Sequence, residues 1–189
     1  MDLFGTAGIR GRAEDEVTPE LALRVGQAVG EPGREFAVGR DGRVTGETLS
    51  AALQAGLQSA GGAVRDLGMV PTPTVAFASQ GRYGIQVTAS HNPPPDNGIK
   101  LFVDGSEFDR PAELEVSDRI AGGTEPTSWD QWGGTESEPV LQAYRDEIVE
   151  FLASQEIPGA HPAGPSRNLD IEQPLEGIPI AVDCGNGMG

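Results

Sequence analysis

A serine, a histidine and an asparagine follow one another at residues 90–92, directly after an alternating apolar run at residues 83–87 that is typical of a half-buried strand. Three prolines, Pro93 to Pro95, come next, and each fixes its own φ and biases the preceding residue toward extended backbone. Such a loop can neither continue a helix nor pair as a central strand, yet it is stiff. Because a hydroxyl on a stiff loop loses little conformational freedom when a ligand binds, Ser90 is a candidate catalytic residue.

The residues around Ser90 favour phosphoryl transfer over hydrolysis. In extended backbone successive side chains point to opposite faces, so His91 is poorly placed as a base for Ser90, and no G-x-S-x-G elbow surrounds the serine. A phosphoserine, in contrast, carries about −1.5 to −2 charges and three acceptor oxygens that need donors, and His91 and Arg10 are the local donors. By general frequency, a lone histidine in a turn is a surface residue more often than a catalyst. A serine hydrolase is the weaker hypothesis, which fluorophosphonate labelling would support.

Lys100 is the only lysine among 13 basic residues, and all the others are arginine. An arginine cannot lose its proton near neutral pH, whereas a lysine can if its pKa is lowered from about 10.4 by desolvation or nearby cations. A titratable amine beside the serine loop therefore suggests an acid–base residue. The alternative is a single exposed lysine without such a role.

Alternating strands and helices must position these residues. Short apolar runs predict strands, and Thr18, Thr45 and Thr72 predict helix starts. Asn97-Gly98 predicts the turn that leads out of the loop. The alternation is typical of an α/β layer, in which ligands bind at the carboxyl ends of strands. The predicted strands cover residues 36–39, 63–68, 83–87 and 99–103, with a helix between each of the first three and the serine loop between the last two.

Fewer helices and strands are predicted in residues 104–177. Pro111 predicts the start of a polar helix to about residue 120, and apolar residues over 140–152 predict a last amphipathic helix. Residues 122–138 read as a loop in which the two tryptophans, Trp129 and Trp132, act as packing anchors.

Three ordered segments resemble the α-D-phosphohexomutases. Thr88 to Pro93 (TASHNP) followed by Asn97 to Lys100 (NGIK) is similar to the active-site loop of that family. Residues 4–11 resemble its N-terminal signature, most closely that of the phosphoglucosamine mutases, and residues 39–43 its second-strand signature. Residues 180–189 resemble the strand and glycine turn that open the family's second domain.

The resemblance implies a fold and a domain organisation. The expected fold is a three-layer α/β/α domain around a mixed sheet over residues 1–156, the first of four family domains. A linker over residues 157–177 and the start of a second domain over residues 178–189 are expected to follow. Within the second-strand signature, Arg40 is expected to be a structural ion-pair partner of Asp41, and Arg43 is a weaker candidate for support of the serine loop.

The resemblance also implies an activity, the interconversion of hexose 1-phosphate and hexose 6-phosphate through a phosphoserine and a bisphosphate intermediate. Ser90 would carry the phosphoryl group, Lys100 would exchange a proton with the substrate hydroxyl, and His91 would assist. Mg²⁺ would bind the phosphoserine, with Ser90 as its only ligand in this chain, because the family's three metal-binding aspartates lie in its second domain. The residues expected to contact substrate or phosphate are Arg10, Thr6, Asn92 and Asn97.

Two readings stay open at this point. The chain is either the N-terminal part of an enzyme acting on glucosamine, glucose or mannose phosphate, or a non-catalytic remnant or sugar-phosphate-binding module that keeps the loop. Since the sugar-reading segments of the family lie outside residues 1–189, these residues alone are expected to have no mutase activity.

The composition limits the classes of binding partner and the cellular compartment that are expected for this chain. The net charge is −16 and the sequence pI is about 4.3, which argues against nucleic acid and anionic membranes as partners. The excess of acid lies mainly in residues 104–156, whereas residues 1–103 are nearly neutral and could accept anionic sugar phosphates. One cysteine, no long apolar stretch and no secretion pattern indicate a cytoplasmic protein, and the acidic, arginine-rich composition suggests a salt-adapted one.

Overall fold

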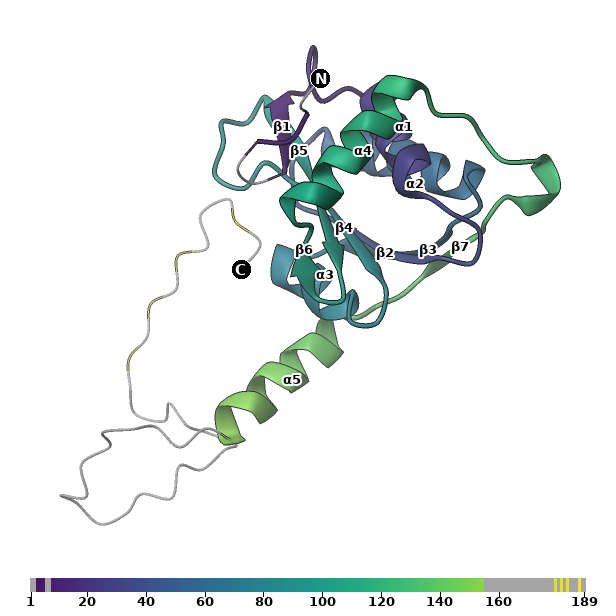
Figure 1. Cartoon of the computed structure of the whole chain (residues 1–189). Coiled ribbons are helices and arrows are strands. Elements are labelled where there is room, and N and C mark those ends of the chain that lie inside the picture. The colour runs from purple at the N-terminus through teal and green to yellow at the C-terminus, as the bar shows by residue number, and fades with distance from the viewer. Residues whose placement is uncertain are drawn as a thin grey trace.

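The computed structural model describes residues 3–5 and 8–154, together with the isolated positions 179, 181, 183 and 187. Strands and helices alternate along the first half of the chain (Figure 1). The strands are β1 (Ile9–Arg12), β2 (Glu35–Arg40), β3 (Ala63–Met69), β4 (Tyr83–Val87), β5 (Asp96–Val103), β6 (Ser106–Glu107) and β7 (Thr135–Ser137). The helices are α1 (Pro19–Val29), α2 (Gly46–Ser59), α3 (Thr72–Ala78), α4 (Arg110–Gly122) and α5 (Leu141–Ser154), with the 3₁₀ turn η1 (Trp129–Gln131).

The strands form one mixed sheet in the order β1-β5-β4-β2-β3-β7, with β6 paired to β5. β2 pairs in parallel with both β3 and β4, whereas β5 runs antiparallel to its neighbours β1 and β4. The carboxyl ends of β2 and β4 therefore lie side by side, and the first residues of β5 lie at the same edge of the sheet. This edge is where a ligand is expected in an α/β layer.

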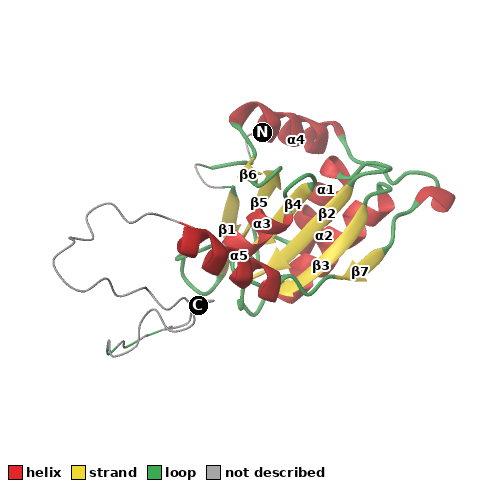
Figure 2. Ribbon diagram, turned by 90° about the horizontal axis from the view of Figure 1, so that it is seen from below, coloured by secondary structure: helices red, strands yellow, loops and turns green. Residues whose placement is uncertain are grey.

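Helices cover both faces of the sheet, which gives three layers (Figure 2). Alternate residues of a strand point to opposite faces. Phe36 and Val38 of β2 join the larger buried cluster with α1, α2 and α4, whereas Ala37 joins the smaller cluster with α3 and the start of α5. The predicted α/β/α mixed-sheet fold is confirmed.

Two of the predicted helix starts use their threonines differently. The Thr18 hydroxyl accepts a hydrogen bond from Leu21 N at 3.2 Å and caps α1, as the sequence predicts. Thr45 precedes α2 but makes no side-chain capping bond, since its own backbone is already helical (φ −81°, ψ −10°). Its hydroxyl accepts a hydrogen bond from the amide of Asn97.

The structure corrects three other predictions. Asn97 and Gly98 lie inside β5 and pair with β1, so the chain turns at residues 89–95 and not at Asn97-Gly98. The segment 122–138 contains β7, a short parallel edge strand that its glycine- and threonine-rich sequence conceals. Trp129 and Trp132 are 84% and 57% exposed, so they are not packing anchors.

The C-terminal elements lie at the margin of the fold. α5 extends away from the sheet and touches α3 near its start, where the rings of Phe77 and Tyr144 are 5.7 Å apart (Figure 1). The predicted linker at 157–177 lies outside the described residues, as does most of the predicted domain start at 178–189. Among the helices that the structure describes, none is long and apolar enough to cross a membrane.

Candidate active site

The serine loop (residues 88–95) joins β4 to β5 at the carboxyl ends of β2 and β4. Ala89 is buried, whereas Ser90 and His91 are exposed to solvent. Ser90 has a φ of +57°, in the left-handed region and not in the extended backbone assumed from the sequence. The side chains of Ser90 and His91 therefore do not point to opposite faces as predicted, and Ser90 Oγ lies 3.4 Å from His91 Nδ1.

Arg43 is the main support of the loop. Its Nη2 donates to the carbonyl oxygens of Ser90 and Asn92 at 2.9 and 2.7 Å. Its Nη1 donates to those of Pro93 and Asp96 at 2.8 and 2.9 Å. One guanidinium thus binds four carbonyls around the turn, and prolines in this segment have no N–H groups that could close the loop themselves.

Asp41 and Thr88 lie beneath the loop and are buried. Thr88 Oγ1 donates to Asp41 Oδ2 at 2.6 Å and accepts a hydrogen bond from Ser90 N at 2.9 Å. Asp41 also accepts from Arg43 N at 3.0 Å, and its carboxylate lies 3.3 Å from Arg43 Nε. Arg40, the expected partner of this carboxylate, reaches the Asp41 carbonyl oxygen instead.

Arg10 approaches the loop from β1. Its Nη1 donates to Asn92 Oδ1 at 3.3 Å, and Asn92 Nδ2 donates in turn to Asp96 Oδ2 at 3.1 Å. Arg10 Nε is buried and has no acceptor in the part of the chain that the structure describes. Arg43 is paired with Asp41 and Lys100 with Glu107, whereas Arg10 has no carboxylate within ion-pair distance among the described residues.

Asn97 is fully buried, and both ends of its amide are engaged. Its Nδ2 donates to Thr45 Oγ1 at 2.9 Å, and its Oδ1 accepts from Gly98 N. Gly98 is required by close approach, since a Cβ there would lie 2.4 Å from Ile9 O and 2.7 Å from Thr88 O. Asn97 thus connects the start of β5 to the start of α2, and its contact with a substrate stays a prediction.

Lys100 lies on β5 opposite Gln86 of β4, and its ammonium forms an ion pair with Glu107 Oε1 at 2.6 Å. The Lys100 side chain is only 14% exposed. The structure does not join it to Ser90 or His91 by a hydrogen bond, so a role in proton exchange stays a prediction. Thr6, the remaining candidate, lies outside the described residues.

The donor set near Ser90 does not make a Mg²⁺ site by itself. Mg²⁺ prefers octahedral oxygen ligands that include carboxylates. Both nearby carboxylates are engaged, Asp41 with Thr88 and Arg43, and Asp96 with Asn92. In the described residues no three His, Cys, Asp or Glu side chains gather in a way that could hold a metal ion.

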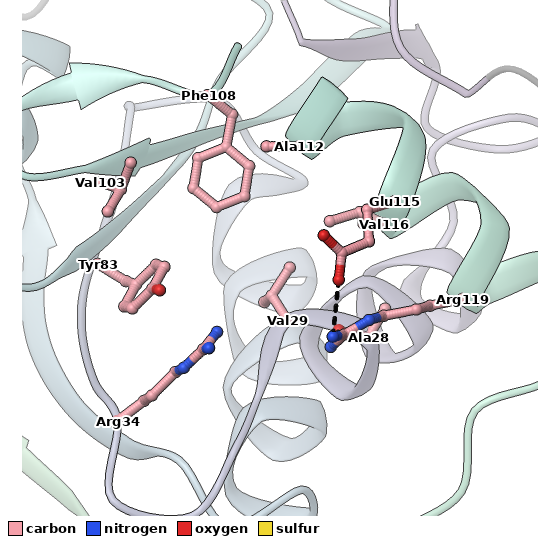
Figure 3. Close-up of a pocket in the computed structure, with 10 residues that line it drawn as sticks. All are labelled: Ala28, Val29, Arg34, Tyr83, Val103, Phe108, Ala112, Glu115, Val116 and Arg119. Carbon is pink, nitrogen blue, oxygen red and sulfur yellow. Dashed lines mark hydrogen bonds and ion pairs between the residues drawn. The ribbon is translucent and has the colours of Figure 1, made fainter. Parts of the chain in front are cut away.

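A pocket of about 210 Å³ lies at the other end of β4 (Figure 3). The Arg34 guanidinium lies 4.8 Å from the centre of the Tyr83 ring, and Arg119 donates to the carbonyl oxygen of Ala28 near the end of α1. None of the candidate site residues lines this pocket. Since its cations are engaged within the fold, we do not assign the active site to it.

Sequence reasoning missed the supporting roles of Asp41 and Thr88 and ranked Arg43 too low. The signal was present in Arg40-Asp41-Gly42-Arg43, where an acid and a base two residues apart follow a buried strand. Which arginine pairs with the acid depends on how the chain turns after β2, and this is a tertiary property that spacing does not give.

Several known proteins are similar to this chain in sequence and in fold. The family model described as phosphoglucomutase/phosphomannomutase, alpha/beta/alpha domain I, matches residues 1–127. A phosphoglucosamine mutase of Mycobacterium leprae is 47% identical over 98% of this chain and 39% of its own length. A phosphopentomutase of Thermococcus kodakarensis is 40% identical over 82% of this chain and 36% of its own length.

Solved structures agree with these sequence matches. The crystal structure of a phosphoglucomutase/phosphomannomutase family protein from Burkholderia thailandensis superposes with a TM-score of 0.71 and 33% identity, over 79% of this chain and 35% of that protein. The chain spans about two fifths of the length of the curated relatives it matches.

Proposed function

This chain belongs to the phosphoglucomutase/phosphomannomutase family through its domain I, and on that premise we propose that it carries the phosphoserine of a phosphohexomutase. The proposed substrates are the 1- and 6-phosphates of a hexose (glucosamine, glucose or mannose), with the hexose 1,6-bisphosphate as intermediate. The relatives named phosphoglucosamine mutase favour a hexosamine phosphate as the substrate. A similar relative is named phosphopentomutase, so the proposal does not specify the sugar.

The proposed reaction has two phosphoryl transfers. In the first, the bond between phosphorus and Ser90 Oγ breaks and a bond forms between phosphorus and the free hydroxyl of the sugar phosphate. That hydroxyl loses its proton and Ser90 Oγ takes one up. The bisphosphate then turns around and its other phosphoryl group is transferred to Ser90, whose hydroxyl loses its proton while the released sugar oxygen takes one up. The net result is isomerisation, and the serine ends the cycle phosphorylated again.

The proposal gives each candidate residue a task. Arg10, which has no carboxylate partner among the described residues, would bind phosphate oxygens as a guanidinium fork, and Thr6 and Asn92 would line the same phosphate site. Asn97, predicted as a further contact, is buried and would support the site from below through Thr45. His91, 3.4 Å from Ser90 Oγ, would donate to the transferring group. Lys100 would exchange the proton with the substrate hydroxyl after releasing Glu107.

Mg²⁺ would supply charge neutralisation at the phosphoryl group when bound. The chain would contribute Ser90 as a ligand, and the described residues do not complete a site.

The observation that carries the proposal is the setting of Ser90. An exposed serine hydroxyl lies at the carboxyl end of a central strand, in a loop held by hydrogen bonds to Arg43 and Thr88, with a cation that lacks a described carboxylate partner nearby.

Replacement of the serine tests the proposal. In the full natural polypeptide, Ser90→Ala is expected to lower mutase turnover by at least about 10³-fold, because the covalent carrier is lost. A coupled assay that follows formation of the 6-phosphate measures this. Ser106→Ala, at an exposed serine of β6, is the matched control and should leave turnover unchanged. Retained turnover in Ser90→Ala would contradict the proposal, and binding of sugar phosphate without turnover in the unaltered protein would favour the binding-module alternative.

A further inference from the structure

We propose that Arg43 is a positioning residue for phosphoryl transfer, which acts with Asp41 to hold the backbone of Ser90 in its left-handed conformation. The inference deepens the proposed function and rests on it. Arg43 would not bind the substrate, because its guanidinium is already occupied on all sides by the loop and by Asp41.

The backbone of Ser90 needs such support. Among the described residues, only Ser90 and Asp104 are non-glycine residues with positive φ. Asp104 precedes Gly105 in the tight turn between β5 and β6, where this conformation is common. Ser90 also lies in a turn, closed by a hydrogen bond from Asn92 N to Ala89 O at 3.1 Å, but neither of its chain neighbours is glycine. A strained conformation of this kind persists only where the surrounding structure fixes it.

The carbonyl oxygen and the N–H of Ser90 are both connected to the Asp41 carboxylate, each through one intervening side chain. The carbonyl oxygen of Ser90 accepts from Arg43 Nη2 at 2.9 Å, and Arg43 Nε lies 3.3 Å from Asp41 Oδ2. The N–H of Ser90 donates to Thr88 Oγ1 at 2.9 Å, and Thr88 Oγ1 donates to the same Asp41 Oδ2 at 2.6 Å. Asp41 itself is fixed by its place directly after β2, where its N–H donates to Val87 O at 3.0 Å.

The arrangement determines where the serine oxygen can lie. With the peptide groups on both sides of Ser90 fixed, only the side-chain torsion remains to place Oγ. Phosphoryl transfer requires the attacking and leaving oxygens to be roughly in line, so a misplaced oxygen lowers the rate much more than it lowers affinity for the sugar phosphate.

The choice of arginine has a geometric reason. A planar guanidinium carries five donors in a fixed fork and can bind four carbonyls and a carboxylate at once, whereas an ammonium carries three donors at one point. Arg43→Lys keeps the charge and loses this span, so it separates positioning from electrostatic attraction.

The test is kinetic and uses the full natural polypeptide. Arg43→Lys is expected to lower kcat by about 10²-fold, and KM for the hexose phosphate should change by less than about threefold. Added guanidinium ion should restore part of the activity of Arg43→Ala. Arg24 forms an exposed ion pair with Glu20 on α1, so Arg24→Lys is the matched control and should leave kcat and KM unchanged. An unchanged kcat in Arg43→Lys, or a rise in KM without a fall in kcat, would overturn the proposal.

Hydrogen exchange gives a second readout that needs no activity. In the unaltered protein the amide of Ser90 is expected to exchange slowly although its side chain is exposed, and Arg43→Lys should speed exchange at Ser90, Asn92 and Asp96 only. Rapid exchange at Ser90 in the unaltered protein would refute the inference even if the variants failed to fold. If the unaltered protein showed no mutase turnover, the proposed function would fail, whereas these exchange rates would still test Arg43.

Discussion

Ser90 is exposed, and the residues that support it from below are buried. Its hydroxyl faces solvent, while Thr88 and Asp41 beneath it are only 4% and 9% exposed. Burial of a carboxylate is costly unless it is paired and hydrogen-bonded, and Asp41 is both. At the scale of single residues, the site thus consists of a reactive group at the surface and a fully satisfied polar pair under it.

The Thr88 hydroxyl should therefore contribute to stability. Thr88→Val removes a donor to Asp41 and an acceptor for Ser90 N, so we expect a loss of about 1–3 kcal/mol in the free energy of unfolding. Urea unfolding measures it. Thr74→Val is the matched control, because Thr74 is fully buried and its hydroxyl has no partner in the described structure. That replacement should be neutral or stabilising, and equal losses for the two variants would contradict the account.

Lys100 allows a sharp test of the proton-transfer role. Lys100→Arg can keep the ion pair with Glu107 but cannot release a proton near neutral pH. Loss of a general acid–base group costs about 10²- to 10⁴-fold in rate, and we expect kcat to fall within that range. Phosphorylation of Ser90 in the isolated variant should persist, as mass spectrometry would show. An unchanged kcat in Lys100→Arg would contradict the proton-transfer role, and Lys100 would then act only through its ion pair with Glu107.

Residue types could be predicted better than residue contacts. Ser90, Lys100 and Arg10 stand out by type and spacing in the sequence, and the structure places Arg10 against the loop. The left-handed φ of Ser90 could not be predicted, because it depends on Arg43, which is distant in sequence and reaches the loop only after β2 and β4 have paired.

At the scale of elements, the amino ends of the strands carry a second polar network, far from the serine loop along the strands. Glu35 at the start of β2 accepts from Arg65 Nε at 2.7 Å and from Arg82 Nη1 at 3.0 Å. Arg82 in turn binds Glu138 in a bidentate pair, with distances of 2.9 and 2.6 Å. These contacts fasten the segment after β7 to the central strands.

This network should make stability depend on pH. The hydrogen bond from Arg65, and then that from Arg82, lowers the pKa of Glu35 below its ordinary value of 4.5, although burial opposes this. A lowered folded-state pKa means that the contribution is present above pH 4.5 and is lost as pH falls through the folded-state value.

Glu35→Gln is expected to reduce the free energy of unfolding by less than about 1 kcal/mol at neutral pH, because the pair is partly exposed to solvent. The difference in the free energy of unfolding between Glu35→Gln and the unaltered protein should become smaller toward pH 3. Urea unfolding at the two pH values measures it, with Glu14→Gln in an exposed pair as the control. A difference that grew in acid would contradict the assigned pKa direction.

Periodicity predicted the long elements well and the short ones poorly. The strands and helices from β2 to α3 appear where apolar runs and breakers predict them, because each buries its own apolar face. β7 was missed because three exposed residues, Thr135 to Ser137, carry no apolar pattern. Their strand conformation comes from pairing with β3.

At the scale of the whole molecule, the chain is one α/β/α unit of a family whose matched relatives are more than twice as long. α5 presents exposed apolar residues to solvent, among them Phe151 and Leu152, at 59% and 63%. The alternation of strands and helices predicted the fold class, and the ordered motifs predicted the family itself. The site beyond the serine loop could not be predicted from residues 1–189. Salt adaptation also stays a prediction.

The most direct test of the central claim is the location of a transferred phosphoryl group. The full natural polypeptide would be dephosphorylated, incubated with a hexose 1,6-bisphosphate, and analysed by intact mass and peptide mapping. We predict a single phosphoryl group on Ser90 that disappears on addition of excess hexose monophosphate and is absent from Ser90→Ala. A phosphoryl group on another residue, or catalytic turnover with Ser90 unmodified throughout, would contradict the account.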